Sequence, residues 1–267
     1  MKPNNPIGIF DSGIGGLTVA NAIKDNLPNE KIIYFGDTQH LPYGNKSIKK
    51  INYFSDRIVQ FLISKQCKAI VIACNTASAL AIQSIIKKAD SQCLIFNVID
   101  PVIKHVVDNR NIKKLGIIGT SATIASNVYK SKINSIRKDI IVKSLATPLL
   151  ATLIEEDNLN LNGNSIIHSY LSNTRLHNID SLILGCTHYP LIESKIKAYY
   201  KSKVNIINSV KHIGVMIEST LRIKNLLNPT CANFKHEFYI SDYTENFQRR
   251  TKLFFKSPII LQEENIF

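Results

Sequence analysis

A short apolar stretch that ends on a cysteine constrains the fold of this chain more than any other segment. In residues 70–79, Ile-Val-Ile-Ala-Cys-Asn-Thr-Ala-Ser-Ala, the apolar run predicts a buried strand, because such strands are short and rich in β-branched side chains. The polar residues from Asn75 to Ser78 predict the cap and first turn of a helix that continues to about Ile86. Cys74 is therefore expected at the carboxyl edge of a parallel sheet, where open α/β proteins bind ligands. We also expect the helix N–H groups to lower the pKa of its thiol.

A second predicted strand leads to another cysteine, in the sequence Gly185-Cys-Thr-His-Tyr-Pro190. A glycine-rich loop at residues 11–16 precedes Cys74, and a loop of small polar residues at 119–126 precedes Cys186 at a similar distance. This repeated order suggests an internal duplication of βα units. Chance similarity between two α/β halves is the alternative.

The rest of the sequence alternates strands with helices, which is typical of an α/β fold. Further strands are expected at residues 7–10, 32–35, 94–98, 115–118, 140–145, 204–207 and 236–240. Asp100-Pro101 interrupts the pattern and is expected where the chain crosses between domains. No long linker separates the halves, so we expect two packed domains with a cleft between them. The sequence does not show which half the C-terminal segment joins.

Composition excludes several classes of protein. The chain has 267 residues, 45% of them hydrophobic and 20% charged, without an apolar run long enough to span a bilayer. Residues 1–6 lack the apolar segment of a signal peptide, so we expect a cytoplasmic protein with no membrane association. Five cysteines, an odd number without C-x-x-C spacing, argue against a disulfide framework, structural zinc and thioredoxin-like chemistry. Of these, Cys67, Cys93 and Cys231 are expected to be buried or incidental.

The net charge of +13 could suggest nucleic acid as a partner. The lysines are scattered or paired, without a stripe interleaved with aromatic residues, so we expect a solvated basic surface and no nucleic-acid binding. Mild steering of an anionic small substrate is a further possibility. The loop at 11–16 is not a dinucleotide-binding fingerprint, because Thr18 occupies the position of the third glycine.

Two thiols on opposite faces of a carbon atom can invert its configuration without a cofactor. One thiolate removes a proton, and the other thiol donates one from the far side. A free thiol has a pKa of about 8.5, close enough to neutrality for both roles. The weak acidity of an amino acid's α-hydrogen also requires fixed donors that stabilise carbanion-like charge. Suitable donors are Ser12, Asn75, Thr76 and Thr187, and His188 could relay protons.

Several long motifs, in the right order along the whole chain, resemble those of the glutamate racemases in the cofactor-independent aspartate/glutamate racemase superfamily. They are Gly8-Ile-Phe-Asp-Ser-Gly-Ile-Gly-Gly16, Tyr34-Phe-Gly-Asp-Thr38 with Pro42-Tyr-Gly44, Val71-Ile-Ala-Cys-Asn-Thr-Ala-Ser78, Gly119-Thr-Ser-Ala-Thr123 and Leu184-Gly-Cys-Thr-His-Tyr-Pro190. The histidine after Cys186-Thr187 favours glutamate, since aspartate racemases tend to carry glutamate at that position. Two departures are Gln39-His40-Leu41 before Pro-Tyr-Gly, and Asn208 where the family often has aspartate.

The resemblance implies a set of site residues. Cys74 and Cys186 would transfer the protons, assisted by Asp11, Glu155 and His188. Glu155 matches the family motif only loosely, and Glu156 is adjacent to it. The implied substrate contacts are Asp11, Ser12, Tyr43, Gly44, Asn75, Thr76, Thr187 and His188.

The resemblance also implies an architecture and a role. We expect two similar α/β domains with largely parallel sheets, one formed by residues 1–97 and 210–267 and the other by 98–209, with the site in the cleft. The implied activity is glutamate racemisation without pyridoxal phosphate or metal, supplying D-glutamate for peptidoglycan, in a protein that forms a homodimer. The alternatives are a racemase of aspartate or another small amino-acid derivative, and a non-catalytic two-domain protein that binds an amino acid.

Overall fold

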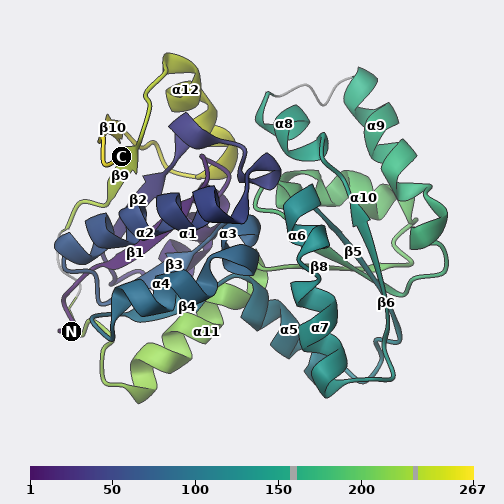
Figure 1. Cartoon of the computed structure of the whole chain (residues 1–267), viewed down its shortest axis with the longest axis horizontal. Helices are drawn as coiled ribbons and strands as arrows, with labels where there is room; N and C mark the ends of the chain where they lie inside the picture. The colour runs from purple at the N-terminus through teal and green to yellow at the C-terminus, as the bar shows by residue number, and fades with distance from the viewer. Residues whose placement is uncertain (157–160, 231–233) are drawn as a thin grey trace.

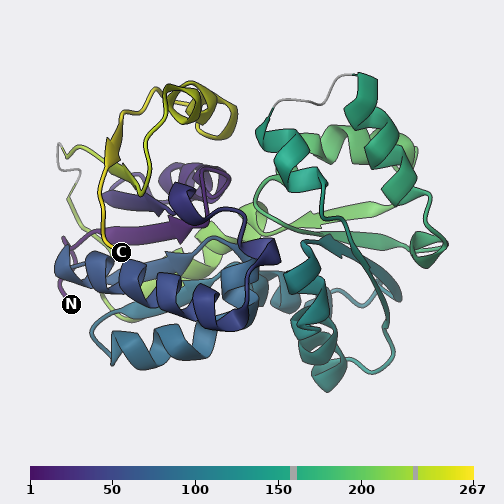
Figure 2. The same ribbon diagram turned by 45° about the horizontal axis from the view of Figure 1, so that its top comes forward.

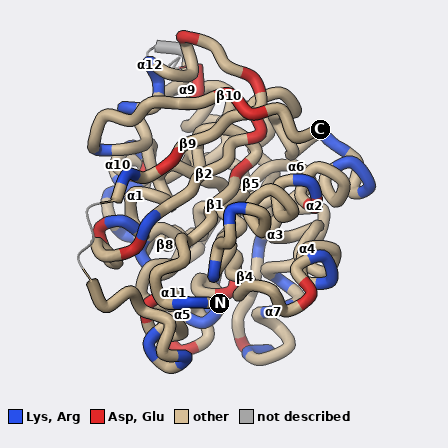
Figure 3. The backbone as a smooth tube through the Cα atoms, turned by 90° about the vertical axis from the view of Figure 1, so that its left-hand side faces the viewer, with Lys and Arg blue, Asp and Glu red and all other residues tan. Residues whose placement is uncertain are grey.

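Two parallel β-sheets lie in two bodies, placed side by side and covered by helices (Figure 1). The computed structural model describes residues 1–156, 161–230 and 234–267. Within these ranges no helix is both long and apolar enough to cross a membrane. Lys and Arg are spread over many elements, with Asp and Glu among them, on the face that Figure 3 shows.

The elements follow the predicted alternation. The first part of the chain contains β1 (Ile7–Asp11), α1 (Leu17–Asn26), β2 (Ile32–Gly36), the 3-10 turns η1 (Thr38–His40) and η2 (Tyr43–Asn45), α2 (Ile48–Ser64), β3 (Ala69–Ile72), α3 (Asn75–Leu80), α4 (Ile82–Ala89) and β4 (Leu94–Asn97). The middle part contains α5 (Ile99–Asp108), β5 (Lys114–Gly119), α6 (Ser121–Ala125), α7 (Val128–Ile136), β6 (Ile141–Ala146), α8 (Leu150–Glu155), α9 (Leu161–Leu171), η3 (Thr174–Leu176), β7 (Ser181–Gly185), η4 (Tyr189–Ile192), α10 (Glu193–Tyr199) and β8 (Asn205–Asn208). The last part contains α11 (Val210–Ile223), β9 (Glu237–Ile240), α12 (Glu245–Phe254) and β10 (Leu261–Glu263).

Four adjacent strands of the first sheet follow the same order as the four strands of the second sheet. The first sheet runs β10-β9-β2-β1-β3-β4 and the second β6-β5-β7-β8, and every pair is parallel. The order β2-β1-β3-β4 in the first sheet matches β6-β5-β7-β8 in the second. The third strand of each set leads to a cysteine, Cys74 after β3 and Cys186 after β7. This shared order is what the predicted duplication requires.

Apolar side chains cover both faces of the first sheet, which explains its continuous apolar strands. Ile7 and Ile9 of β1 face a core that includes α1 and α11, whereas Phe10 faces a second core with α2. The C-terminal segment joins this sheet, because β9 pairs with β2 and α11 packs against α1. The domain boundaries at residues 98 and 209 stay a prediction.

The structure corrects two expectations about local structure. The single helix expected after Cys74 is two helices, since the backbone breaks at Ala81 between α3 and α4, where no glycine or proline marks the break. Pro101 does not end a segment but lies in the first turn of α5, where its missing N–H is not needed. Asn97 Oδ1 accepts hydrogen bonds from the N–H groups of Ile99 and Asp100 at this helix start (3.0 and 2.9 Å). Helices α5 and α10 and strand β10 were not predicted.

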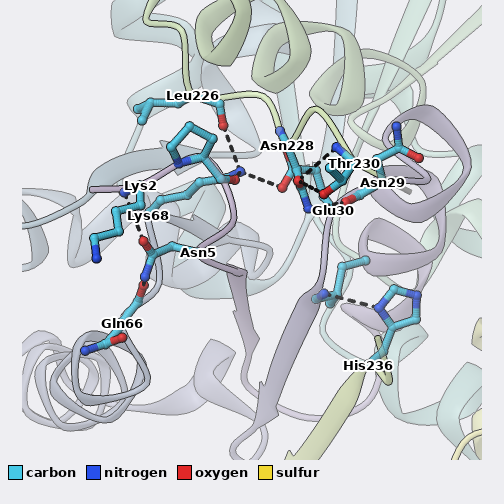
Figure 4. A network of polar contacts seen from close by, with 12 residues as sticks. Lys2, Asn5, Asn29, Glu30, Gln66, Lys68, Leu226, Asn228, Thr230 and His236 are labelled. Atoms are coloured by element: carbon cyan, nitrogen blue, oxygen red, sulfur yellow. Dashed lines mark hydrogen bonds and ion pairs between the residues drawn. The ribbon is translucent and has the colours of Figure 1, made fainter. Parts of the chain in front are cut away.

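A buried lysine joins three distant segments of the first body (Figure 4). Lys68, fully buried just before β3, forms an ion pair with Glu30 (Nζ to Oε2, 2.6 Å) and donates to the carbonyl oxygens of Leu226 (2.8 Å) and Pro3. Glu30 also accepts a hydrogen bond from the N–H of Asn228 (2.9 Å). Burial lowers the pKa of Lys68, and the carboxylate of Glu30 opposes that effect. Removing either partner would leave an unpaired buried charge, so this network holds the segment after α11 against the first sheet.

Candidate active site

A cavity of about 220 Å³ lies between the two bodies, at the carboxyl ends of strands from both sheets. Residues that follow β1, β3, β5 and β7 line it, which is the edge where α/β sheets bind ligands. In Figures 1 and 2, α12 of the first body faces α8 of the second, and residues of both helices line this interdomain cavity. Its lining is Ser12, Gly13, Leu41, Pro42, Tyr43, Gly44, Cys74, Asn75, Thr76, Thr120, Ala151, Thr152, Glu155, Glu156, Cys186, Thr187, His188, Asn246, Phe247 and Arg250.

Cys74 is the N-cap of α3. Its Sγ accepts a hydrogen bond from the N–H of Ala77 (3.5 Å) and donates one to Ser12 Oγ (3.5 Å). Burial, together with a smaller effect of the charge of Asp11, raises the pKa of the Cys74 thiol to about 12. The expectation of a lowered pKa was wrong, because the N–H of Ala77 and the hydroxyl of Ser12 do not outweigh the loss of water. Cys74 is thus a neutral thiol, ready to donate a proton, at neutral pH.

Asp11 is fully buried at the end of β1, near Cys74 but outside the cavity lining. Its Oδ2 accepts a hydrogen bond from the N–H of Gly16 (2.9 Å), while Oδ1 has no hydrogen-bond partner among the described residues. A side chain at Gly16 would place Cβ 2.4 Å from Asp11 Cβ, so the glycine makes this approach possible. Burial raises the pKa of Asp11, and the charge of His188 opposes this. A carboxyl group with a raised pKa can accept and return a proton.

The thiol of Cys186 lies next to the imidazole of His188, which in turn lies next to the carboxylate of Glu155. His188 Nδ1 lies 3.6 Å from Cys186 Sγ and 3.4 Å from Thr187 Oγ1, and His188 Nε2 lies 3.4 Å from Glu155 Oε2. Burial by itself would lower the pKa of His188, but its interactions with Cys186 and Glu155 together raise it well above the usual value. These interactions favour the imidazolium form of His188, which is placed to attract a thiolate at Cys186.

The glycine-rich loop of the first body makes room for this imidazole. A Cβ at Gly15 would lie 2.4 Å from His188 Cε1 and 2.7 Å from Thr187 Oγ1. The hydroxyl of Thr18 donates to the carbonyl oxygen of Thr187 (3.1 Å). The first body thus positions the Cys186 side of the site directly.

The carboxylate that reaches His188 is Glu155, which is buried at the end of α8. Glu156 is exposed, although it also lines the cavity. The geometry therefore favours Glu155 over Glu156 as the carboxylate that assists Cys186.

The remaining predicted residues lie in the same cavity. Asn75 Oδ1 accepts a hydrogen bond from Tyr129 (2.7 Å), which leaves its buried Nδ2 without a partner among the described residues. Thr76 Oγ1 is 2.9 Å from Thr120 Oγ1, across the two bodies. The structure thus brings every substrate contact expected from the sequence to this cavity, except that Asp11 lies behind its wall. They are Ser12, Tyr43, Gly44, Asn75, Thr76, Thr187 and His188.

The buried wall beside Tyr43 includes the first departure from the family pattern. Tyr43 donates to Asp37 Oδ2 (2.7 Å), and His40 Nδ1 lies 2.9 Å from Asp37 Oδ1 while its ring stacks on Phe54 at 3.9 Å. His40 therefore fixes the orientation of Asp37. The second departure, Asn208, donates to Glu193 Oε2 and lies outside the cavity lining.

Sequence reasoning missed the residues that come from α12. Asn246, Phe247 and Arg250 line the cavity from the C-terminal segment, whose partner half the sequence did not show. Thr120, Leu41, Pro42, Gly13, Ala151 and Thr152 were also not proposed as site residues. Thr120 carried a signal, because its loop occupies in the second half the place of the 11–16 loop in the first. No signal in the sequence marked the α12 residues as part of the site.

Two other cysteines, Cys67 and Cys93, do not line this cavity. Cys67 and Cys93 are buried, and burial raises their pKa values to about 12 and about 11. Cys231 lies outside the described residues. Among residues 1–156, 161–230 and 234–267, no group of three His, Cys, Asp or Glu side chains is arranged to hold a metal ion.

Comparison with known proteins gives consistent results. Residues 17–215 match the family described as Asp/Glu/Hydantoin racemase. A glutamate racemase of Neisseria meningitidis serogroup A is 39% identical over 91% of this chain and 90% of its own length, and one of Syntrophus aciditrophicus is 36% identical over 92% and 90%. The crystal structure of glutamate racemase from Francisella tularensis in complex with D-glutamate superposes with a TM-score of 0.92, at 37% identity, over 99% of this chain and 98% of that one.

Proposed function

The chain belongs to the Asp/Glu/hydantoin racemase family, and we propose that it is a glutamate racemase in which Cys74 and Cys186 exchange protons with the α-carbon of the substrate. The observation that carries the mechanism is that two strand-end thiols, one from each body, line a single cavity. The other like pair in the described lining, Glu155 and Glu156, comes from adjacent positions at the end of one helix, whereas the two thiols come from different bodies.

In one direction, the thiolate of one cysteine takes the α-proton and the electron pair stays on the α-carbon. The thiol of the other cysteine then gives its proton to the opposite face, which leaves the second cysteine as the thiolate. The reverse reaction exchanges the two roles, so the groups must be alike. Burial favours the protonated thiol at Cys74, and the contact of His188 with Cys186 favours the imidazolium form of His188, which would stabilise a thiolate at Cys186 when it forms.

The carbanion-like charge needs donors that are fixed before the reaction. The Nδ2 of Asn75, unpartnered among the described residues, and the hydroxyls of Ser12, Thr76 and Thr187 surround the thiols. Asn75, Thr76 and Thr187 are buried, which limits competition from water and strengthens their hydrogen bonds relative to those in solution.

We further propose that the reaction needs neither pyridoxal phosphate nor a metal, because the chain supplies both proton carriers. The remaining expectations are part of the same proposal. They are a role in supplying D-glutamate for peptidoglycan, a cytoplasmic location, a homodimer, no nucleic-acid partner and domain boundaries near residues 98 and 209.

Two other functions are the competitors. A racemase of aspartate or another small amino-acid derivative would use the same thiols, but the histidine after Cys186-Thr187 and the relatives named glutamate racemase favour glutamate. A non-catalytic amino-acid-binding protein would not need a thiol on each side of the ligand.

Circular dichroism of L-glutamate and of D-glutamate tests the proposal. Fresh, reduced protein without added pyridoxal phosphate should abolish the optical activity of either enantiomer. The variant that carries both Cys74→Ala and Cys186→Ala is the matched control, which excludes a contaminating racemase. If the optical activity of glutamate persists but that of aspartate is lost, the substrate is aspartate and not glutamate. Calorimetric binding of glutamate with no turnover of any amino acid would establish the binding protein.

A further inference from the structure

A tyrosine of the second body reaches across to a donor of the first body. Tyr129 lies in the first turn of α7, and its buried ring belongs to the apolar core of the second body, with Ile133 and Ile183. Its hydroxyl donates a hydrogen bond to Oδ1 of Asn75, in the first turn of α3 (2.7 Å). Tyr129 does not line the interdomain cavity, whereas Asn75 does. The proton-transfer chemistry assigns no purpose to this contact between the bodies.

The ring of Tyr129 also lies beside the end of the strand that delivers Cys186. A Cβ at Gly185, the residue before Cys186, would lie 3.7 Å from Tyr129 Cε2, which is ordinary van der Waals contact. Burial raises the pKa of Tyr129, and negative charge at Cys186 and, to a smaller extent, at Asp100 acts in the same direction. The hydroxyl therefore keeps its proton at neutral pH and stays available as a donor.

The hydrogen of this hydroxyl decides which way the amide of Asn75 faces. A buried O–H group needs an acceptor, and within residues 1–156, 161–230 and 234–267 the hydroxyl of Tyr129 has no hydrogen-bond partner besides Asn75. If the amide were reversed, its Nδ2 would face Tyr129 and the O–H would have no acceptor. The arrangement with Oδ1 toward Tyr129 satisfies both groups, and it turns Nδ2 away from Tyr129.

The direction of this amide matters to a site that receives an anionic substrate. The Nδ2 of Asn75 is buried and has no partner among the described residues, and such a donor costs free energy unless a bound molecule accepts its hydrogen bond. With the amide as it stands, Asn75 offers a donor to the substrate and to the carbanion-like charge that develops at the α-carbon. With the amide reversed, Asn75 would offer a carbonyl oxygen, which repels that charge.

Resting on the glutamate racemase function, we propose that Tyr129 is a positioning residue, whose hydroxyl holds the amide of Asn75 with its N–H donors toward the substrate. Tyr129 does not touch the substrate and acts only through Asn75. Because the two residues belong to different bodies, this hydrogen bond exists only while the bodies are packed as the structure shows. The donor at Asn75 is therefore oriented when the two bodies are together, which is also when Cys74 and Cys186 share one cavity.

Steady-state kinetics of Tyr129→Phe tests this role, because the substitution removes the hydroxyl and keeps the ring. We expect kcat/KM for glutamate to fall about 10-fold, since the amide is then free to reverse. In an Asn75→Ala background the same substitution should cause no further loss, because no amide remains to be oriented. Tyr239→Phe is the matched control. The ring of Tyr239 is also buried and its hydroxyl donates to Glu237 (2.7 Å), but it does not line the cavity, so this variant should keep the activity of the unaltered protein.

Glutamate binding gives the same comparison where Asn75→Ala is too slow to assay. Calorimetry on protein that also carries Cys74→Ala and Cys186→Ala measures affinity without turnover. Tyr129→Phe should raise the Kd for glutamate about 10-fold with Asn75 in place and leave it unchanged in the Asn75→Ala background. In either measurement, no effect of Tyr129→Phe, or an equal effect in both backgrounds, would overturn the assignment while the racemase function stood. Failure of the unaltered protein to racemise glutamate would instead remove the function itself.

Discussion

The strand ends that deliver Cys74 and Cys186 occupy the same position in two sheets of the same strand order, but their surroundings differ. Cys74 caps a helix, has a buried carboxyl group nearby and keeps its proton. Cys186 precedes a 3-10 turn and faces an imidazolium that is supported by Glu155. A duplicated framework thus supplies two thiols of similar position, and the neighbouring side chains give each a different electrostatic environment. Each thiol must act as acid in one direction and as base in the other, so these different surroundings do not restrict either thiol to one role.

The largest expected effect comes from removing either thiol. Cys74→Ala and Cys186→Ala should each reduce racemisation by at least about 10³-fold, since each removes a group that acts as both acid and base. The two variants should differ in deuterium oxide. Each should still exchange the α-hydrogen of one enantiomer, and the retained enantiomer should be opposite in the two variants. Equal exchange of both enantiomers by one single variant would show that each cysteine does not serve one enantiomer alone.

His188→Asn should produce the next largest effect, a loss of about 100-fold in kcat/KM, because Cys186 loses the imidazolium beside it. The two enantiomers have the same free energy, so kcat/KM must fall equally in both directions. The individual kcat values for L- and D-glutamate should change unequally. The exposed His177, replaced by Asn, is the control. Equal changes in both kcat values would show that His188 serves the two thiols alike.

Glu155→Gln and Glu156→Gln sharpen the assignment of the assisting carboxylate. Of these two carboxylates, Glu155 is the one at ion-pair distance from His188, so Glu155→Gln should reduce activity by about 10-fold and Glu156→Gln by much less. Loss of the Glu155 charge should also lower the pKa of His188 toward its usual value. NMR titration of the His188 ring measures this directly. A larger effect of Glu156→Gln on either quantity would reverse the assignment.

Asp11→Asn should have the smallest effect of these substitutions, a modest increase in the stability of the folded protein. Burial raises the pKa of Asp11, so the folded protein binds this proton more tightly than the unfolded chain. The associated stability is fully present below the unfolded pKa of about 3.9 and is lost as pH rises through the folded value. The substituted amide cannot ionise, so at pH 7 the variant should unfold at a temperature about 2–4 °C higher. Thermal unfolding at pH 3 and pH 7 checks this, and a lower melting temperature at pH 7 would contradict it.

The sequence predicts the framework of this site well. Apolar runs that end on Cys74 and Cys186, with small polar residues after them, were sufficient to place both thiols at helix or turn starts beside a cleft. Local pattern carries this information, because a strand end and a cap depend on neighbouring residues. The family resemblance then supplied Glu155 and His188, whose contact the structure shows.

The parts that sequence could not give depend on packing. The pKa of Cys74 moves opposite to the expected direction because burial, which the whole cavity determines, outweighs the local N–H donor. Arg250 reaches the cavity only because β9 and β10 join the first sheet and carry α12 with them. The residues near Arg250 contain no local motif that would have revealed this.

The pairing of β9 with β2 also has a consequence during protein synthesis. Strand β2 ends at Gly36, but the strand that covers its outer edge begins only at Glu237. On the ribosome, the nascent chain must therefore carry an uncovered parallel edge while the whole second sheet is made. We expect this interval to be the period of greatest risk of aggregation for the growing chain, and it ends when residues 237–240 emerge and pair with β2, after which residues 261–263 add the last strand.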